Sequence, residues 1–183
     1  QIDDVLMQLQ FDTNVMGPLR TMRAVLPTWC ERGSGVIVNV SSIAGRVAPP
    51  YGGAYSASKH ALEAMSESLH FEVSQLGIRV HLIEPGRFTT NFQDNIVHPA
   101  SWTGSAQEQR ALAFRNSLTS LDGGGPPSDP QAVADAIARA ATDPSMPFRT
   151  LVGEDAALID ATKTSMSFED FETTMRTALD WHD

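Results

Sequence analysis

Tyr55 and Lys59 lie four residues apart in a segment of helical periodicity, so their side chains share one helix face, one turn apart. An ammonium beside a phenol favours the phenolate, which lowers the tyrosine pKa from about 10 towards the range of a general acid/base. Such a pair needs a substrate oxygen nearby and a donor that holds it. Ser42 follows an apolar strand, and ligands of open α/β sheets bind outside the carboxyl ends of the strands. The three residues therefore predict proton transfer to or from a bound oxygen.

Hydrophobic periodicity identifies the elements that must position these residues. Helices are predicted over about 12–32, from Ala54 to about Leu76, over about 106–118 and from Asp129-Pro130 to about Ala141, and strands over Gly35–Ser41, Arg79–Ile83 and about Arg149–Val152. Pro27 should kink or loosen the end of the first helix, because proline lacks an amide donor and clashes with the preceding turn. Alternating strands and helices imply right-handed crossovers onto a parallel sheet with helices on both faces, which is a doubly wound α/β fold.

Three predicted strands make a small sheet, and the first of them would present an open, strongly apolar edge. Something should normally lie beside such a strand. Residues 87–128 contain no strand signal, and the loop Gly123-Gly124-Gly125-Pro126-Pro127 within them is a hinge candidate. The chain lacks an initiator methionine and opens directly on a periodic segment. We therefore expect that it begins within a longer protein.

Composition predicts one soluble domain, because 183 residues with 42% hydrophobic content suffice for one substantial core. The formal net charge of −9 disfavours nucleic acid and anionic membranes as partners, since both repel an acidic surface. The apolar runs fall far short of the roughly 20 residues that a membrane span needs. Cys30 is the only cysteine, and the five histidines show no spacing typical of metal ligands. We expect no metal site and a cytoplasmic protein.

Four motifs, taken together, resemble the short-chain dehydrogenase/reductase family in order and spacing. They are Asn14-Val15-Met16-Gly17, the strand from Gly35 to Ser41 continued by Ser42-Ile43-Ala44-Gly45, Tyr55-Ser56-Ala57-Ser58-Lys59, and Pro85-Gly86-Arg87-Phe88-Thr89-Thr90. The resemblance is continuous from about residue 10 to residue 92 and is looser beyond. It implies a Rossmann-like fold, of which these 183 residues would form the C-terminal catalytic portion as a single domain.

The family resemblance implies a role for each matching residue. Tyr55 would be the general acid/base, and Ser42 would hydrogen-bond the substrate oxygen. Lys59 would lower the Tyr55 pKa and bind the nicotinamide ribose of NAD or NADP, and Asn14 would hold a water that extends the proton path. The residues that would line the cofactor together with Tyr55 and Lys59 are Pro85, Gly86 and Thr90. Hydride would reach a carbonyl carbon as Tyr55 protonates its oxygen, and oxidation would be the reverse.

Aromatic residues follow the last of these motifs, where the family has its substrate loop, here predicted over residues 93–128. Those that would form an apolar lid over a hydrophobic substrate are Phe88, Phe92, Trp102, Phe114 and Leu118. Ordinary packing is the alternative for this set. Arg46, Pro50 and Tyr51 either border the same pocket or form a plain surface loop. The two long helices resemble the pair that makes the family's dimer interface, which implies a homo-oligomer, although core packing would also explain their apolar faces.

The family's glycine-rich phosphate loop and the residue that selects NAD or NADP would precede residue 1, so the chain as given would hold only the nicotinamide end of a cofactor. Two classes of function remain open. The first is an NAD(P)-dependent oxidoreductase that interconverts a small secondary alcohol and a ketone, with a reductase of carrier-bound ketoacyl groups as the near variant. The second is a non-catalytic fragment with a structural or association role, unable to bind a dinucleotide.

Overall fold

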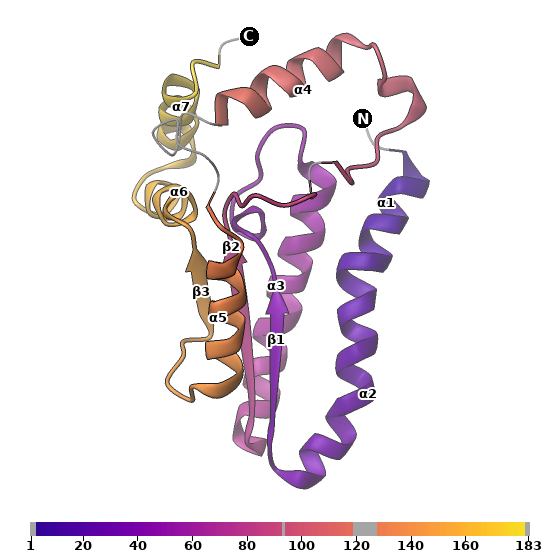
Figure 1. Cartoon of the computed structure of the whole chain (residues 1–183), viewed down its shortest axis with the longest axis vertical. Helices are drawn as coiled ribbons and strands as arrows, with labels where there is room; N and C mark the ends of the chain where they lie inside the picture. Colours follow the sequence, from indigo (N-terminus) through magenta and orange to yellow (C-terminus); the bar gives the residue numbers. More distant parts are fainter. Residues whose placement is uncertain (1–2, 93, 119–127, 182–183) are drawn as a thin grey trace.

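Three parallel strands form the sheet of this protein, whose computed structural model describes residues 3–92, 94–118 and 128–181. The strands are β1 (Gly35–Val40), β2 (Ile78–Pro85) and β3 (Arg149–Val152), and they lie in the order β1-β2-β3 (Figure 1). Gly35 pairs with Ile78, and Leu82 pairs with Arg149. All three predicted strands are confirmed, because short β-branched runs between turn residues suit a sheet that is covered on both faces.

The N-terminal helical run begins earlier than the sequence predicted. It consists of α1 (Asp4–Phe11), a π-helical turn (Asp12–Met16) and α2 (Gly17–Arg32). The prediction of a start near residue 12 was wrong because Asp3 caps α1, its side chain accepting the Leu6 amide at 2.8 Å. Pro27 lies inside α2, which nevertheless continues to Arg32.

The helix that bears Tyr55 and Lys59 is α3 (Gly53–Val73), followed by a 3₁₀ turn over Ser74–Leu76. Gly77 ends it at φ 76°, as expected of a left-handed C-terminal cap. The remaining helices are the 3₁₀ turns at Ile43–Gly45 and Ala100–Trp102, α4 (Ala106–Ser117), α5 (Gln131–Thr142), α6 (Glu154–Thr164) and α7 (Phe168–Ala178). The hinge candidate at 123–127 lies outside the described residues.

Two apolar cores lie on opposite faces of the sheet, which confirms the doubly wound α/β fold. On one face α2 and α3 pack on Ile37, Ile78 and Val80. On the other, α5 packs on Ile83 and Val38. Both crossovers step in the same direction across the sheet, from β1 to β2 to β3, yet their helices cover opposite faces (Figure 1).

The two crossovers therefore have opposite hands, and the prediction that both are right-handed was wrong. The physical reason lies in the length of the second connection. The segment between β2 and α5 covers residues 86–130, whereas the segments that join α3 to β1 and to β2 cover only residues 41–52 and 74–77. A segment of that length can reach the other face of the sheet before the chain returns to β3.

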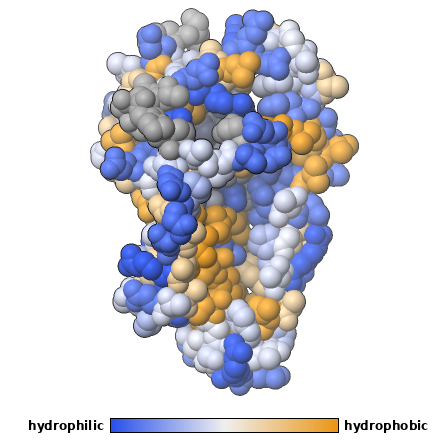
Figure 2. Space-filling view, viewed as in Figure 1, coloured by the Kyte–Doolittle hydropathy of each residue, from blue (hydrophilic) through white to orange (hydrophobic). Residues whose placement is uncertain are grey.

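β1 is an edge strand in the described part of the chain, as predicted. Figure 2 shows an apolar surface along it, between α5 and α2. A cavity of about 450 Å³ follows this edge, lined by β1 and by residues of α2 such as Met22 and Val25, and it reaches Lys59. Among the described residues, no helix is long and apolar enough to cross a membrane.

Candidate active site at the carboxyl end of the sheet

Ser42 lies where β1 and β2 end side by side. Its Oγ accepts the Ala44 amide at 3.1 Å, which caps the 3₁₀ turn at Ile43–Gly45, and lies 3.5 Å from the Pro85 carbonyl. The Ser42 hydroxyl is also close enough to the Tyr55 phenol to favour its ionised form. Within the described residues, the hydroxyl of the adjacent Ser41 is buried without a hydrogen-bond partner. Ser42 rather than Ser41 is therefore the serine that acts on the Tyr55 phenol, and its role in binding a substrate oxygen stays a prediction.

Tyr55 and Lys59 share one face of α3, as their spacing predicted. The Lys59 ammonium lies 5.7 Å from the centroid of the Tyr55 ring and donates to the Val40 carbonyl at 3.0 Å. That carbonyl belongs to the last residue of β1. Lys59 therefore links the helix to the end of the edge strand, beside the cavity that follows it.

The expected lowering of the Tyr55 pKa by Lys59 was wrong. Burial raises the pKa of the Tyr55 phenol above its ordinary value, and the nearby Ser42 hydroxyl opposes this rise. Burial likewise lowers the pKa of the Lys59 ammonium, with the charge of Glu63 opposing it. The reason is that both groups are partly removed from water, and the ammonium is directed to a backbone carbonyl.

Asn14 reaches the same helix through a chain of hydrogen bonds. Its amide donates to the Ser58 hydroxyl at 3.1 Å, and that hydroxyl donates to the Tyr55 carbonyl at 2.7 Å. Asn14 lies in the π-helical turn between α1 and α2, a widened turn that is frequent at functional sites. Its side chain also lines the cavity that reaches Lys59. The structure therefore brings Asn14, Ser42, Tyr55 and Lys59 into one region.

The Pro85-Gly86 turn continues β2 directly beyond the site. Gly86 is in contact with the buried carboxylate of Asp155, and a Cβ at position 86 would stand 2.1 Å from its Oδ1. The Arg87 amide donates to Asp155 Oδ2 at 2.7 Å. Thr90, also predicted to line the cofactor, is exposed, and its hydroxyl accepts the Phe92 amide at 3.3 Å.

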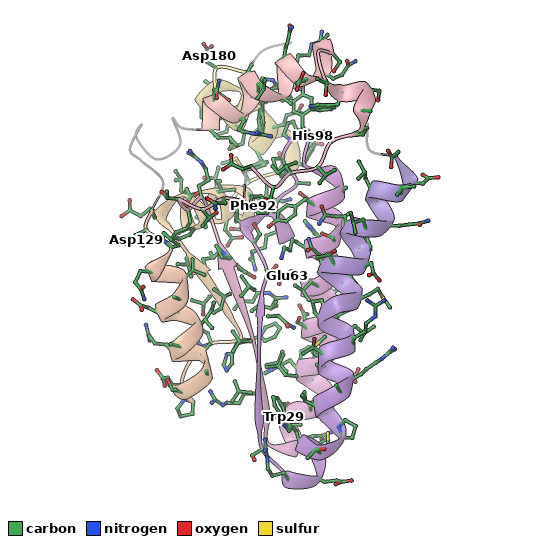
Figure 3. All side chains as sticks on the ribbon, turned by 45° about the vertical axis from the view of Figure 1, so that its right-hand side comes forward. Trp29, Glu63, Phe92, His98, Asp129 and Asp180 are labelled. Carbon is green, nitrogen blue, oxygen red and sulfur yellow. The ribbon has the colours of Figure 1, made fainter. Side chains whose placement is uncertain are left out.

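The predicted substrate residues lie in different places. The ring of Phe92, which is labelled in Figure 3, is 5.3 Å from the ring of Tyr55. Trp102 instead contacts Tyr51 and stacks on His98 at 5.1 Å. Phe88 lies against the backbone of Gly153. The structure thus brings Phe92 to Tyr55, whereas the ring of Trp102 contacts the rings of His98 and Tyr51.

Sequence reasoning missed three features around this site. Ser58 connects Asn14 to Tyr55, Asp155 holds the turn after β2, and Glu84 is a fully buried carboxyl just before Pro85. Glu84 left a signal in the sequence, since it is an acidic residue within an otherwise apolar strand. Asp155 left none, because only the fold brings it to Gly86.

Comparison with known proteins accords with this geometry. The sequence pattern of the short chain dehydrogenase family, adh_short, matches residues 1–100. This chain belongs to the short-chain dehydrogenase family. Among relatives, an uncharacterized oxidoreductase of Schizosaccharomyces pombe is 35% identical over 147 residues, which cover 79% of this chain and 59% of that protein. A 3-ketodihydrosphingosine reductase of Bacteroides thetaiotaomicron is 38% identical over 149 residues, which cover 79% of this chain and 54% of that protein.

Solved structures of dehydrogenases superpose on the chain. A short-chain dehydrogenase from Streptomyces avermitilis has a TM-score of 0.70 and 29% identity, covering 99% of this chain and 65% of that one. A 4-hydroxyisoleucine dehydrogenase complexed with NADH and succinate has a TM-score of 0.65 and 26% identity, covering 83% of this chain and 59% of that one. The chain spans less than two thirds of the length of these relatives. The expectation that it lacks the family's glycine-rich half stays a prediction.

Proposed function

We propose that this chain carries the proton-transfer site of an NAD(P)-dependent oxidoreductase that interconverts a secondary alcohol and a ketone. One observation carries the proposal. The Ser42 hydroxyl acts on the Tyr55 phenol at the carboxyl end of β1, where it opposes the rise in the pKa of that phenol, and the Lys59 ammonium lies 5.7 Å from the centroid of the Tyr55 ring. A carbonyl oxygen bound between these two hydroxyls would meet two donors at once, which would stabilise negative charge developing on it.

In the direction of reduction, Tyr55 would donate its proton to the carbonyl oxygen while Ser42 holds that oxygen. The raised pKa of the Tyr55 phenol suits this role, because the residue stays protonated at neutral pH. The Lys59 ammonium would then return a proton to Tyr55. Asn14 would hold a water beside Lys59 that extends this proton path. In the direction of oxidation, the same groups would accept the proton of the alcohol.

The residues present fit a nicotinamide cofactor, which when bound would supply or accept the hydride. A cavity of about 450 Å³ lies beside the end of β1 and is lined by Asn14, Val40 and Lys59, so a ribose hydroxyl would find an ammonium donor there. Tyr55 would border the nicotinamide on one side, and the turn from Pro85 through Gly86 to Thr90 on the other. The related 4-hydroxyisoleucine dehydrogenase is complexed with NADH, which supports this assignment, and the proposal covers both NAD and NADP.

A hydrophobic ketone or alcohol is the proposed substrate, because Phe92 lies against Tyr55 and aromatic residues gather in the segment that follows. We propose that residues 93–128, of which 93 and 119–127 lie outside the described residues, form the substrate lid, and that the family's dimer contact, through α2 and α3, applies here. The similarity to the 3-ketodihydrosphingosine reductase of Bacteroides thetaiotaomicron supports a hydrophobic ketone. A carrier-bound ketoacyl substrate fits less well, since a chain of net charge −9 would repel an acidic carrier.

Replacing Tyr55 by phenylalanine tests the proposal. Turnover of hydrophobic ketones with NADPH and NADH should fall about 100-fold or more, because a positioned general acid contributes about 10²–10⁴ in rate. Tyr51→Phe is the matched control, since it removes the chain's other tyrosine hydroxyl and should keep most of the activity. Unchanged turnover in Tyr55→Phe would refute the role of Tyr55. Failure of the wild-type chain to bind either cofactor would favour the non-catalytic alternative.

A further inference from the structure

A cluster of buried charges lies between α3, the sheet and α6, one turn along α3 from Lys59. At its centre are Glu63, which projects from α3 towards the sheet (Figure 3), and Glu84 of β2. Glu63 is 6% exposed and Glu84 0%. Glu63 follows Lys59 by four residues on the same helix face, and Glu84 immediately precedes Pro85. The two carboxyls therefore stand between the helix that bears the proton-transfer pair and the turn proposed to hold the cofactor.

The hydrogen bonds of these carboxyls are incomplete. Three of their four oxygens have no hydrogen-bond donor within the described part of the chain. These are both oxygens of Glu84 and Oε1 of Glu63. Arg149 Nε donates to Glu63 Oε2 at 3.1 Å but is 3.5 Å from Glu84 Oε1, and Arg46 Nη1 is 3.6 Å from that atom. A buried carboxyl without a donor is costly, and each carboxyl lies near the other, since Arg149 Nε is within 3.1 Å of Glu63 Oε2 and 3.5 Å of Glu84 Oε1.

Both arginines are engaged elsewhere as well. Arg46 Nε donates to Asp160 Oδ1 at 2.6 Å, and Arg149 forms a second ion pair with Glu67. Each guanidinium is thus shared between an outer carboxylate and the central pair. A hydrogen bond between Glu63 and Glu84 requires that one of the two carry a proton, because two carboxylates offer only acceptors.

We propose that Glu63 and Glu84 share one proton, and that this carboxyl pair is a positioning device that joins the helix of Lys59 to the strand that leads into Pro85-Gly86. The geometry of the pair does not depend on the proposed function, whereas its consequence for Lys59 rests on that function. Glu63 and Glu84 touch neither of the proposed reacting groups. They act through the placement and charge of Lys59.

The electrostatics support a proton held close to neutral pH. Burial raises the pKa of Glu84 to about 7, the charge of Glu63 adds to this rise, and Arg46 and Arg149 oppose it. The other charged or titratable groups around the cluster are Glu67 and His60 on α3 and Asp160 and Lys163 on α6. A cleft of about 270 Å³ between α3 and α6 borders Glu63 and gives solvent protons a path to the pair.

Loss of the shared proton adds one negative charge near Lys59. The charge of Glu63 already opposes the lowering of the Lys59 pKa by burial. A second carboxylate beside Glu63 should extend this effect and should also weaken the α3–β2 connection, since two like charges then face each other. The environment of the Lys59 ammonium should therefore change in a step as the pH crosses neutrality.

The chain's lysine content makes this step measurable, because Lys59 and Lys163 are its only lysines. In the whole chain with ¹³C-labelled lysine, NMR should give two Cε signals, one for each lysine. The Lys163→Arg variant removes one signal and thereby assigns the other to Lys59. We expect the Lys59 signal to show a step near pH 7 in addition to its own titration. Glu84→Gln should remove the step, because its amide donates permanently to Glu63 in place of the proton. Glu67→Gln is the matched control and should keep it.

A step that persists in Glu84→Gln, or its absence from the wild-type chain, would overturn the proposal. Infrared spectroscopy of the wild-type chain provides a measurement that needs no variant. The carbonyl stretch of a buried protonated carboxylic acid should be present at about pH 5 and absent at about pH 9, and a spectrum without it at the lower pH would also overturn the shared proton. Neither experiment requires turnover, so an inactive chain would refute the proposed function and leave this inference standing.

Discussion

At position 86 the backbone passes so close to Asp155 that only hydrogen fits as a side chain. An alanine Cβ there would stand 2.1 Å from Asp155 Oδ1. We expect Gly86→Ala to lower the free energy of unfolding by about 1–3 kcal/mol, because the turn must move away from the carboxylate that holds the Arg87 amide. Urea denaturation measures this. Gly53→Ala is the control, since a Cβ there meets no atom within 4 Å and should change stability by less than about 1 kcal/mol.

Ser58 and Ser56 give a second test at single residues, because both are buried on α3 but, among the described residues, only the Ser58 hydroxyl has a hydrogen-bond partner. Ser58 is 0% exposed and links Asn14 to the Tyr55 carbonyl. Ser58→Ala should cost about 1–2 kcal/mol, since the Asn14 amide then loses its acceptor. Ser56 has a buried hydroxyl without a hydrogen-bond partner among the described residues, so Ser56→Ala should be neutral or stabilising. Equal thermal shifts for the two variants would contradict the hydrogen-bonded connection.

At the scale of elements, the pairing of Glu63 on α3 with Glu84 on β2 should make the free energy of unfolding depend on pH. The pKa of Glu84 is about 7 in the folded chain against an ordinary value of 4.5, so its protonated carboxyl stabilises the folded state. This contribution to the free energy of unfolding is fully present below about pH 4.5 and is lost as the pH rises through about 7. The loss is at most about 3.5 kcal/mol, since the two pKa values differ by about 2.5 and one pKa unit corresponds to about 1.4 kcal/mol. Chemical denaturation between these two pH values should show falling stability in the wild-type chain and a flatter profile in Glu84→Gln.

The same element-level contacts explain why the second crossover was mispredicted. The local rule for strand, helix and strand assumes a short connection that returns over one face of the sheet. Here residues 86–130 intervene before α5, and Val133, Ala136 and Ile137 find their apolar partners on the face opposite α3. Nothing in the periodicity of α5 distinguishes the two faces, because a single amphipathic stripe fits either.

At the scale of the whole molecule, the apolar edge of β1 should dominate how the chain behaves in solution. An edge strand exposes unpaired backbone groups, and Figure 2 shows that this edge is also apolar. We predict that the chain as given associates with itself, and that Val36→Lys near the start of β1 reduces this. Val5→Lys, on the exposed face of α1, should have little effect. Sedimentation velocity distinguishes the outcomes, and a wild-type chain that is strictly monomeric would refute the prediction.

Sequence alone determined most of the secondary structure and the candidates for the proposed proton-transfer site. Strand and helix periodicities are local, and the four-residue spacing of Tyr55 and Lys59 places them on one helix face in any fold that keeps the helix. Ser42 was predictable because the carboxyl ends of parallel strands gather ligand-binding groups at one edge of the sheet. The start of α1 was missed because the apolar stripe of this helix is weaker than the apolar stripe of α2.

Only the tertiary structure decided which groups meet across the sheet and how their charges behave. Glu63, Glu84 and Arg149 are far apart in sequence and come together because α3, β2 and β3 pack side by side. The raised pKa of Tyr55 likewise depends on burial by segments such as the one bearing Phe92. Burial and long-range pairing are sums over the packed chain, and a local sequence pattern therefore carries no record of them.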